Sequence, residues 1–148
     1  MLLDPLRLFE HIHGHLGWLA AATLVHPAIV LRSRTRRAHL AVGLSTALVT
    51  VAAAMGVGIY GAYRERLKQG IFLQAPVMGL LFERKEHLAF GAVVLAWAGA
   101  AAYFAAPAAT PKTRDRLRVV AFRAFCASAA LGLVVAALGT VVATYRSF

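Results

Sequence analysis

The feature that most constrains this chain is a set of four long apolar runs, at residues 14–31, 38–61, 87–106 and 119–144. Each run is long enough to cross the ~30 Å hydrocarbon core of a bilayer as a helix, which takes roughly 17 to 25 residues. Lipid offers the backbone no hydrogen-bond partners, so a spanning segment must be a helix or part of a closed barrel. None of the runs alternates apolar and polar residues as a barrel strand does. The sequence therefore predicts an all-α fold, a single transmembrane domain over residues 1–148 that forms a four-helix bundle.

The composition agrees with this fold and limits the partners of the chain. Hydrophobic residues make up 60% of the sequence and charged residues 15%, which is far from an ordinary soluble domain. The net charge of +10 is confined to the ends and short connections of the apolar runs, which carry no nucleic-acid-binding motif. We therefore expect contact with the lipid bilayer and its anionic headgroups, and no nucleic-acid partner.

The distribution of lysine and arginine predicts the orientation of the bundle. Nine of these residues lie on the side that holds the connections between the first and second runs and between the third and fourth runs, and seven lie on the other side. Cytoplasmic connections of membrane proteins carry the excess of Lys and Arg. The chain is therefore expected in a bacterial inner membrane, with both termini extracytoplasmic.

The six histidines fall at two levels of this predicted bundle. The outer level holds His11, His13, His15 and His87. The inner level holds His26, near the end of the first run, and His39, at the start of the second. Ionisable residues inside a membrane are costly and usually face the bundle interior with a partner. Each level therefore offers a pair of histidines from two different helices.

The spacing along the first run selects among these histidines. His15 and His26 are eleven residues apart, so at ~100° per residue they differ by only ~20° in direction and by roughly 16 Å in height. His13 points to nearly the opposite side from His26. A regular helix therefore favours His15 as the outer partner of His26 on one face, with His13 in reserve.

A five-residue repeat opens the second and third runs. The second run begins His39-Leu-Ala-Val-Gly43, and the third begins His87-Leu-Ala-Phe-Gly91 from the opposite face of the membrane. An inverted repeat of this kind places equivalent histidines at opposite sides of the bilayer. Gly43 and Gly91 lie one turn deeper, where a bulky planar group can approach each helix. Small residues continue along the His39 face at Gly43, Thr46, Thr50 and Ala53.

Two stacked histidine pairs in a helical bundle resemble the transmembrane di-haem b-type cytochromes, in which paired histidines on neighbouring helices hold one haem toward each membrane face. The resemblance covers the bundle architecture and the histidine placement over residues 11–106. It implies one or two haem b groups, ligated by His15 and His87 outside and by His26 and His39 inside. The first run would then supply two ligands and the next two runs one each, which departs from the respiratory cytochrome b pattern.

The same resemblance implies an electron-transfer protein or a subunit of an oxidoreductase complex, with quinol or other redox membrane subunits as partners. Haem propionates need cations at the membrane interface. The candidates are Arg36, Arg37 and Arg118 inside, and Arg84 and Lys85 outside. An alternative role for these cations is to fix the topology of the chain.

The long outer connection, residues 62–86, is charged at both ends and apolar between them. This composition predicts a segment that lies in the membrane interface or folds over the bundle mouth as a short amphipathic element. Beside an outer haem it would form a quinol pocket, with Glu83 or Glu86 accepting protons. The alternative interpretation is a salt-bridged end of the connection just before the third run.

Two other classes of function stay open. A transition-metal carrier or sensor would use the outer-level histidines, because imidazole suits copper, zinc and nickel, but it would need the segment from His11 to His15 to be non-helical. A cofactor-free membrane scaffold or assembly subunit would use its histidines only for hydrogen bonds between helices. The chain has no nucleotide-binding loop, nucleophile triad or metalloprotease helix, which argues against a hydrolytic enzyme.

Overall fold

The computed structural model describes residues 5–33 and 38–144, and over these ranges it contains helices and no strand. Five α-helices follow one another along the chain: α1 (Pro5–Arg32), α2 (His39–Tyr63), α3 (Gln69–Gln74), α4 (Pro76–Ala105) and α5 (Pro111–Thr144). A π-helical segment joins α2 to α3, and a 3-10 turn follows α4. Four of the helices are long and apolar enough to cross a membrane. The predicted all-α fold with four membrane spans is confirmed.

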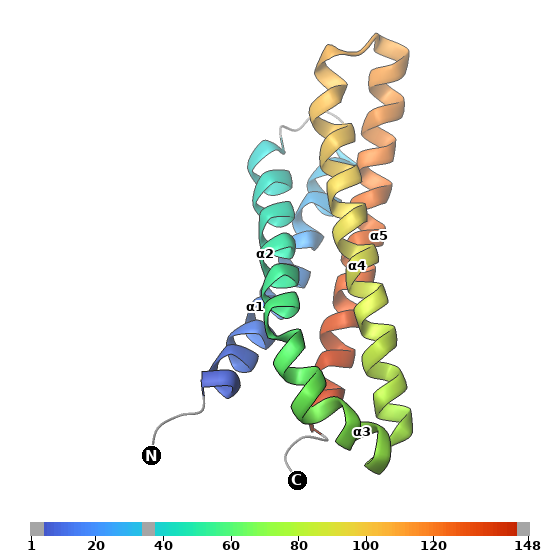
Figure 1. The fold of residues 1–148 in the computed structure, drawn as a ribbon. Coiled ribbons are helices and arrows are strands. Elements are labelled where there is room, and N and C mark those ends of the chain that lie inside the picture. The colour runs from blue at the N-terminus through green and yellow to red at the C-terminus, as the bar shows by residue number, and fades with distance from the viewer. Residues whose placement is uncertain (1–4, 34–37, 145–148) are drawn as a thin grey trace.

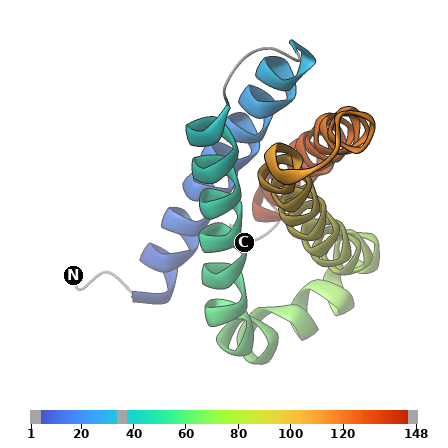
Figure 2. The same cartoon turned by 90° about the horizontal axis from the view of Figure 1, so that it is seen from above.

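The four long helices form a ring around a common interior (Figures 1 and 2). α1 packs on α2 and on α5, while α4 packs on α5 and on α2. The α4–α5 interface is the most extensive of the four and the α2–α4 interface the least extensive. α1 and α4 therefore lie diagonally across the bundle, without an extensive interface. The first residues of α1 and the last residues of α5 lie at the same end of the bundle (Figure 1).

Three of the long helices begin earlier than the apolar runs, and each begins at a proline. α1 starts at Pro5 instead of residue 14, α4 at Pro76 instead of residue 87, and α5 at Pro111 instead of residue 119. Proline fits the first helical position because its missing N–H has no helical partner there. Hydropathy detects only the part of a helix that crosses lipid, whereas the 30 residues of α4 extend about 45 Å. The helices therefore continue beyond the hydrocarbon core.

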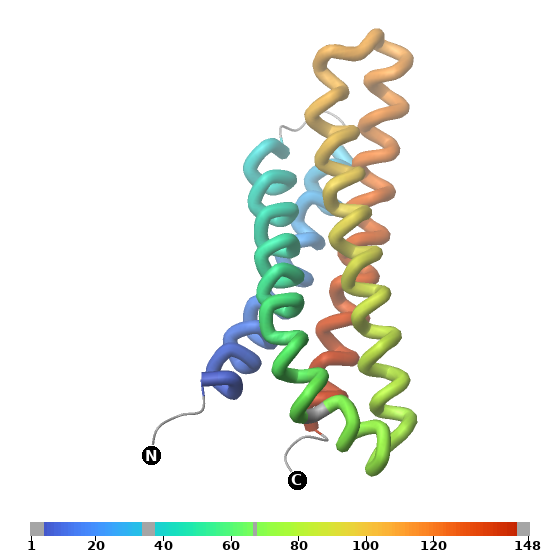
Figure 3. The backbone as a smooth tube through the Cα atoms, in the orientation of Figure 1, coloured from blue at the N-terminus to red at the C-terminus, as the bar shows by residue number. Residues whose placement is uncertain are grey.

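The connection predicted over residues 62–86 is helical and folds against one end of the bundle. The tube in Figure 3 passes from α2 into the π-helical segment, through α3, and turns back into α4. The rings of Tyr63 and Phe82 stack with their centroids 4.6 Å apart. Ile71 on α3 and Val142 on α5 belong to the same buried cluster. The connection thus closes one end of the bundle with its apolar side chains.

The interior of the bundle is filled by small and medium apolar side chains. Leu24, Val42, Ala96 and Phe125 are completely buried. Gly99 on α4 allows a close approach, because a Cβ there would lie 2.9 Å from the ring of Phe125. Small residues at helix contacts are typical of membrane bundles, where packing rather than the hydrophobic effect holds helices together.

Candidate functional site

Three of the four favoured histidines lie on the outer faces of their helices. His15 and His26 on α1 and His87 on α4 are exposed. The Nδ1 atom of His87 lies 2.8 Å from the carbonyl oxygen of Glu83, one turn earlier on the same helix, and donates a hydrogen bond to it. His15 and His26 share one face, as the spacing predicts, but in a single chain this face points away from the bundle.

His13 is the outer-level histidine that faces a neighbouring helix. Its imidazole is half-buried and lies over Gly56 on α2, where a Cβ atom would come within 2.9 Å of His13 Cε1. α1 is helical from Pro5, so His13 and His15 are about 200° apart and point to opposite sides. The same helical geometry excludes the non-helical segment that the metal-carrier hypothesis requires.

The bundle interior of one chain does not fit a haem held by the proposed histidine pairs. His15 and His87 lie on α1 and α4, the two helices that stand diagonally without an extensive interface. His26 and His39 lie on adjacent helices, but both are exposed. The space between the helices is occupied by the buried side chains described above. Within residues 5–33 and 38–144, no three His, Cys, Asp or Glu side chains come close enough to hold a metal ion.

Of the cations proposed for haem propionates, Arg36 and Arg37 cannot be placed, whereas Arg84 and Lys85 lie within the described residues. Arg36 and Arg37 lie outside the residues that the structure describes. Arg84 is exposed. The ammonium group of Lys85 lies 4.7 Å from the centroid of the Phe82 ring, at a distance typical of a cation–π contact.

The end of the bundle beside α3 contains an ion pair at Glu83, one of the two carboxylates predicted to accept protons from quinol. Lys68 donates a hydrogen bond of 2.9 Å to the carboxylate of Glu83. This hydrogen bond raises the pKa of Lys68 above its ordinary value of 10.5. The ring of Phe72 lies so close to Gly79 that a Cβ there would meet it at 2.7 Å. The salt-bridged interpretation of this segment is thus confirmed for Glu83.

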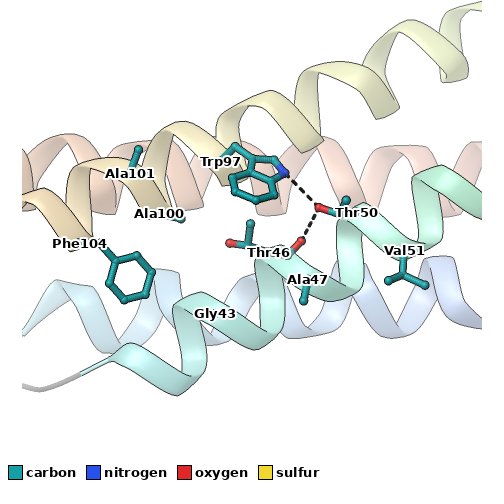
Figure 4. A pocket seen from close by; sticks show the side chains of 9 residues that line it. All are labelled: Gly43, Thr46, Ala47, Thr50, Val51, Trp97, Ala100, Ala101 and Phe104. Carbon is teal, nitrogen blue, oxygen red and sulfur yellow. Dashed lines mark hydrogen bonds between the residues drawn. The ribbon is translucent and has the colours of Figure 1, made fainter.

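A groove of about 540 Å³ lies between α2 and α4, at the least extensive helix interface (Figure 4). From α2 it is lined by Gly43, Thr46, Ala47, Thr50 and Val51. From α4 it is lined by Trp97, Ala100, Ala101 and Phe104. The α2 side contains the small residues that the sequence places along the His39 face. Glycine and alanine leave the space, and the rings of Trp97 and Phe104 border it.

The polar atoms of the groove already have hydrogen-bond partners within the protein. Trp97 donates its indole N–H to the hydroxyl of Thr50, at 3.1 Å. Thr50 donates to the carbonyl oxygen of Thr46 at 2.7 Å, and Thr46 donates to that of Val42 at 2.8 Å. Figure 4 shows the first of these bonds crossing from α4 to α2 and the second running along α2. The groove therefore presents an apolar surface.

A polar pair lies at one end of this groove. His39 is one turn before Gly43, and its ring centroid is 6.0 Å from that of Phe104. The Nδ1 atom of His39 lies 3.4 Å from the hydroxyl of Tyr103, which also accepts a 2.8 Å hydrogen bond from the backbone N–H of Ala38. The imidazole is exposed. His39 thus combines an exposed polar edge with a hydrogen bond to the neighbouring helix.

The aromatic members of this site, Trp97, Tyr103 and Phe104, were not identified from the sequence. Their spacing on α4 offers a signal, since positions 97 and 104 are two turns apart and share a face. The shared face of Trp97 and Phe104 indicates a site only when α4 is known to face the small residues of α2.

Comparison with known protein families, with characterised proteins and with solved structures gave no match. The fold and the groove therefore define the class of this protein. It has four helices long and apolar enough to cross a membrane, and an apolar groove between two of them with the His39–Tyr103 pair beyond one end.

Proposed function

We propose that this protein binds a lipid-soluble molecule from within the bilayer, in the groove between α2 and α4. The observation that carries the proposal is the groove itself, because its volume of about 540 Å³ falls in the range of small-molecule sites. Its polar atoms are engaged with one another, so it offers an apolar ligand a surface without unsatisfied donors. The groove lies between two membrane-spanning helices, which gives a ligand access from the lipid.

The experiment that tests the proposal compares a filled groove with an open one. Gly43 lines the groove, and a Cβ built there meets no atom within 4 Å, so Gly43→Leu starts a side chain in open space at the groove. Gly58 on the same helix also has open space and does not line the groove, which makes Gly58→Leu the matched control. Lipophilic molecules extracted from each purified protein are identified by mass spectrometry.

We expect one lipophilic molecule to co-purify with the wild type and with Gly58→Leu, and to be lost from Gly43→Leu. An identical set of extracted molecules from all three proteins overturns the proposal. The thermal stability of each variant shows whether the fold has been kept.

The orientation that we propose for the bundle gives the groove a defined place in the membrane. Exposed cations lie at the helix ends on the side of the bundle where α2 begins with His39: Arg32 ends α1, and Lys112 and Arg116 lie near the start of α5. We propose that this end faces the cytoplasm of a bacterial cell, because cytoplasmic connections carry the excess of basic residues. The polar end of the groove then opens at the cytoplasmic leaflet of the inner membrane.

Electron transfer through haem b is the second candidate function. It is favoured by the exposure of His15 and His26 on one face of α1, about 16 Å apart along the helix axis. Ionisable residues in a membrane segment usually have a protein partner, so a haem on this face would be shared with another subunit. Bound haem b would supply one-electron transfer.

A pyridine haemochrome assay of the purified protein, with a reduced-minus-oxidised spectrum, tests this second candidate. Stoichiometric haem that is lost in His26→Ala supports it. A colourless protein from haem-sufficient cells, in complexes extracted gently enough to keep their subunits, overturns it.

A further inference from the structure

Exposed side chains form one straight stripe along α1. The stripe lies roughly opposite Ala20, Leu24 and Leu31, which are buried in the bundle. Its members are spaced alternately four and three residues apart, which is the heptad pattern of a helix that packs along a neighbouring helix. The exposed residues of the stripe are Leu8, Ile12, His15, Leu19, Ala22, His26 and Ile29.

His15 lies on this stripe at a depth where lipid would surround its imidazole. His13, two residues earlier, lies over Gly56, within the apolar run of residues 38–61. α1 and α2 run in opposite directions (Figure 1), so His15 lies about 3 Å further along that run. It is exposed, and it forms no hydrogen bond within residues 5–33 and 38–144. Because an ionisable side chain in a membrane is costly and usually has a partner, this position indicates a contact with another chain.

His26 lies nearer the other end of the same stripe and is also level with the apolar run of α2. Thr23, three residues earlier, accepts the hydrogen bond of Ser45, which belongs to that run. His26 is exposed and likewise has no hydrogen-bond partner among the described residues. The neighbouring Pro27 is buried in the bundle, so its ring does not stand on the stripe. One outward face of α1 thus carries two polar groups, about 16 Å apart along the helix axis.

The outward face of α2 shows the composition expected of a surface that meets only lipid. Its exposed side chains include Leu40, Leu44 and Val51, all apolar. The exposed histidine of α2, His39, stands at the helix start and has Tyr103 as a neighbour within hydrogen-bond distance. The stripe on α1 departs from this composition at two positions inside the apolar region. This departure indicates that a protein surface covers the stripe.

We infer that the stripe on α1 binds a second copy of the chain, in a two-fold dimer in which the two α1 helices run parallel. Copies of one chain insert in the same orientation, because the same basic residues fix it. The two-fold axis of a pair then lies along the membrane normal, and equivalent helices run in the same direction. In a parallel pair each stripe residue packs against its own counterpart. His15 therefore meets the partner's His15, and His26 meets the partner's His26.

The chemistry of imidazole makes a second copy the partner that fits both positions. A neutral imidazole has one N–H donor and one acceptor nitrogen, so two imidazoles can form a hydrogen bond with each other. The parallel dimer supplies this pair at two depths without any further polar residue. A different protein would need complementary polar groups at both depths, matched to the eleven-residue separation of His15 and His26. Apolar side chains flank both pairs, and Ala22 between them lets the two helices approach closely.

Cysteine cross-linking in native membranes tests the interface. Cys126→Ala removes the single cysteine of the chain, and Ala22→Cys then places one thiol on the stripe between the two histidines. Gly14→Cys is the matched control, because Gly14 is exposed on the same helix, does not belong to the stripe, and has open space for a Cβ. Both proteins are oxidised with copper phenanthroline, and the products are separated by mass without a reducing agent.

We expect a disulfide-linked product of twice the chain mass from Ala22→Cys and none from Gly14→Cys. No product from Ala22→Cys, equal products from both proteins, or a product with a protein of different mass overturns the inference. A haem that took one imidazole from each copy would hold the two helices apart. The disulfide at position 22 would therefore also count against the second candidate function.

The histidine pairs are tested by the affinity of the dimer in phosphatidylcholine vesicles. Thr113→Cys in the Cys126→Ala background carries a donor or an acceptor dye, and energy transfer is measured as the protein is diluted in lipid. We expect His15→Ala and His26→Ala each to weaken the dimer about 3- to 10-fold, as loss of one hydrogen bond between membrane helices requires. His26→Asn keeps a donor and an acceptor and is expected to recover part of the affinity.

His87→Ala is the matched control for these substitutions. His87 is an exposed histidine on α4, which lies diagonally across the bundle from α1. Its removal should leave the affinity of the dimer unchanged. Equal affinities for the wild type and all three alanine variants, or energy transfer no greater than random proximity produces, overturns the inference.

The dimer interface is separate from the groove of the proposed function. The groove is lined by residues of α2 and α4, so Gly43→Leu should remove a groove ligand without changing the affinity of the dimer. Cross-linking of Ala22→Cys therefore tests the interface whether or not the groove binds a ligand.

Discussion

Ser45 on α2 donates a hydrogen bond of 2.7 Å to the carbonyl oxygen of Thr23 on α1. Pro27 lies four residues after Thr23 within the same helix, and proline has no N–H to donate to that oxygen. In a membrane, a backbone oxygen without a partner costs several kcal/mol. The hydroxyl of Ser45, which is 2% exposed, replaces the missing helical hydrogen bond and also joins the two helices.

The first prediction is that Ser45→Ala destabilises the bundle by about 1–3 kcal/mol, because it leaves a buried carbonyl oxygen unsatisfied. The cost should fall when Pro27→Ala restores the helical N–H. A double-mutant cycle of unfolding free energies in mixed micelles measures the coupling between the two positions. If Ser45→Ala lowers the unfolding free energy equally in the wild type and in the Pro27→Ala variant, the serine does not compensate for the proline.

The second prediction concerns the contact between His13 and Gly56. Gly56→Ala should force the half-buried imidazole of His13 out of its rotamer, since the new methyl group meets it at 2.9 Å, and so destabilise the protein by about 0.5–1.5 kcal/mol. The same substitution should be nearly neutral in a His13→Ala background. The exposed His15 supplies the control, because His15→Ala should leave the cost of Gly56→Ala unchanged. If the His15 variant rescues and the His13 variant does not, the orientation of α1 is wrong.

The third prediction is that Gly99→Ala weakens the α4–α5 interface. A methyl group at this position would lie 2.9 Å from the Phe125 ring and 3.2 Å from the Cβ of Ala124. Neighbours on both sides limit relaxation, so we expect a loss of about 1–3 kcal/mol in unfolding free energy. Gly58→Ala, which enters open space on α2, should be neutral or slightly stabilising because alanine favours helices. Equal effects at the two glycines would contradict the packing.

The fourth prediction follows from the raised pKa of Lys68 in its ion pair with Glu83. A folded-state pKa above the unfolded value of 10.5 means that the pair stabilises the protein below that pH. The contribution is lost as the pH rises through the higher folded-state pKa. Solvent and salt screen this partly exposed pair, so the effect should be small. Melting temperatures of the wild type and Lys68→Met should differ at neutral pH and converge under alkaline conditions.

The fold could be predicted because its main constraint is local. A run of apolar residues long enough to cross lipid must be helical whatever its neighbours are, so four runs gave four helices. The helix starts could not be placed from hydropathy, because Pro5, Pro76 and Pro111 lie beyond the apolar runs. Which helices lie next to one another depends on the packing between them, and the sequence of a single helix does not specify that packing.

The candidate site shows the same division between local and non-local information. The stripe that follows His39 through Gly43 and Thr46 could be identified by helical spacing alone. The helix opposite it could not, so the roles of Trp97 and Phe104 were not predicted. Spacing also placed His15 and His26 on one face, but it carries no information on whether that face points inward. In the structure that face is exposed.

The last prediction concerns the orientation on which the polar end of the groove depends. Thr113, at the start of α5, and Gln69, at the start of α3, are exposed near opposite ends of the bundle. Cys126→Ala removes the single cysteine of the chain, after which Thr113→Cys or Gln69→Cys introduces one reactive thiol. With the basic connections in the cytoplasm, a membrane-impermeant maleimide added to intact spheroplasts should label Gln69→Cys and leave Thr113→Cys unmodified.

Permeabilised spheroplasts give the control, since both thiols should then react to the same extent. The reverse pattern in intact spheroplasts would place the basic connections outside the cell. The groove would then open toward the outer leaflet, and His39 would lie there. The hydrogen bond between His39 and Tyr103 and the apolar surface beside Gly43 are the same in either orientation. The labelling pattern therefore decides which leaflet the groove opens to and does not change the chemistry of the groove.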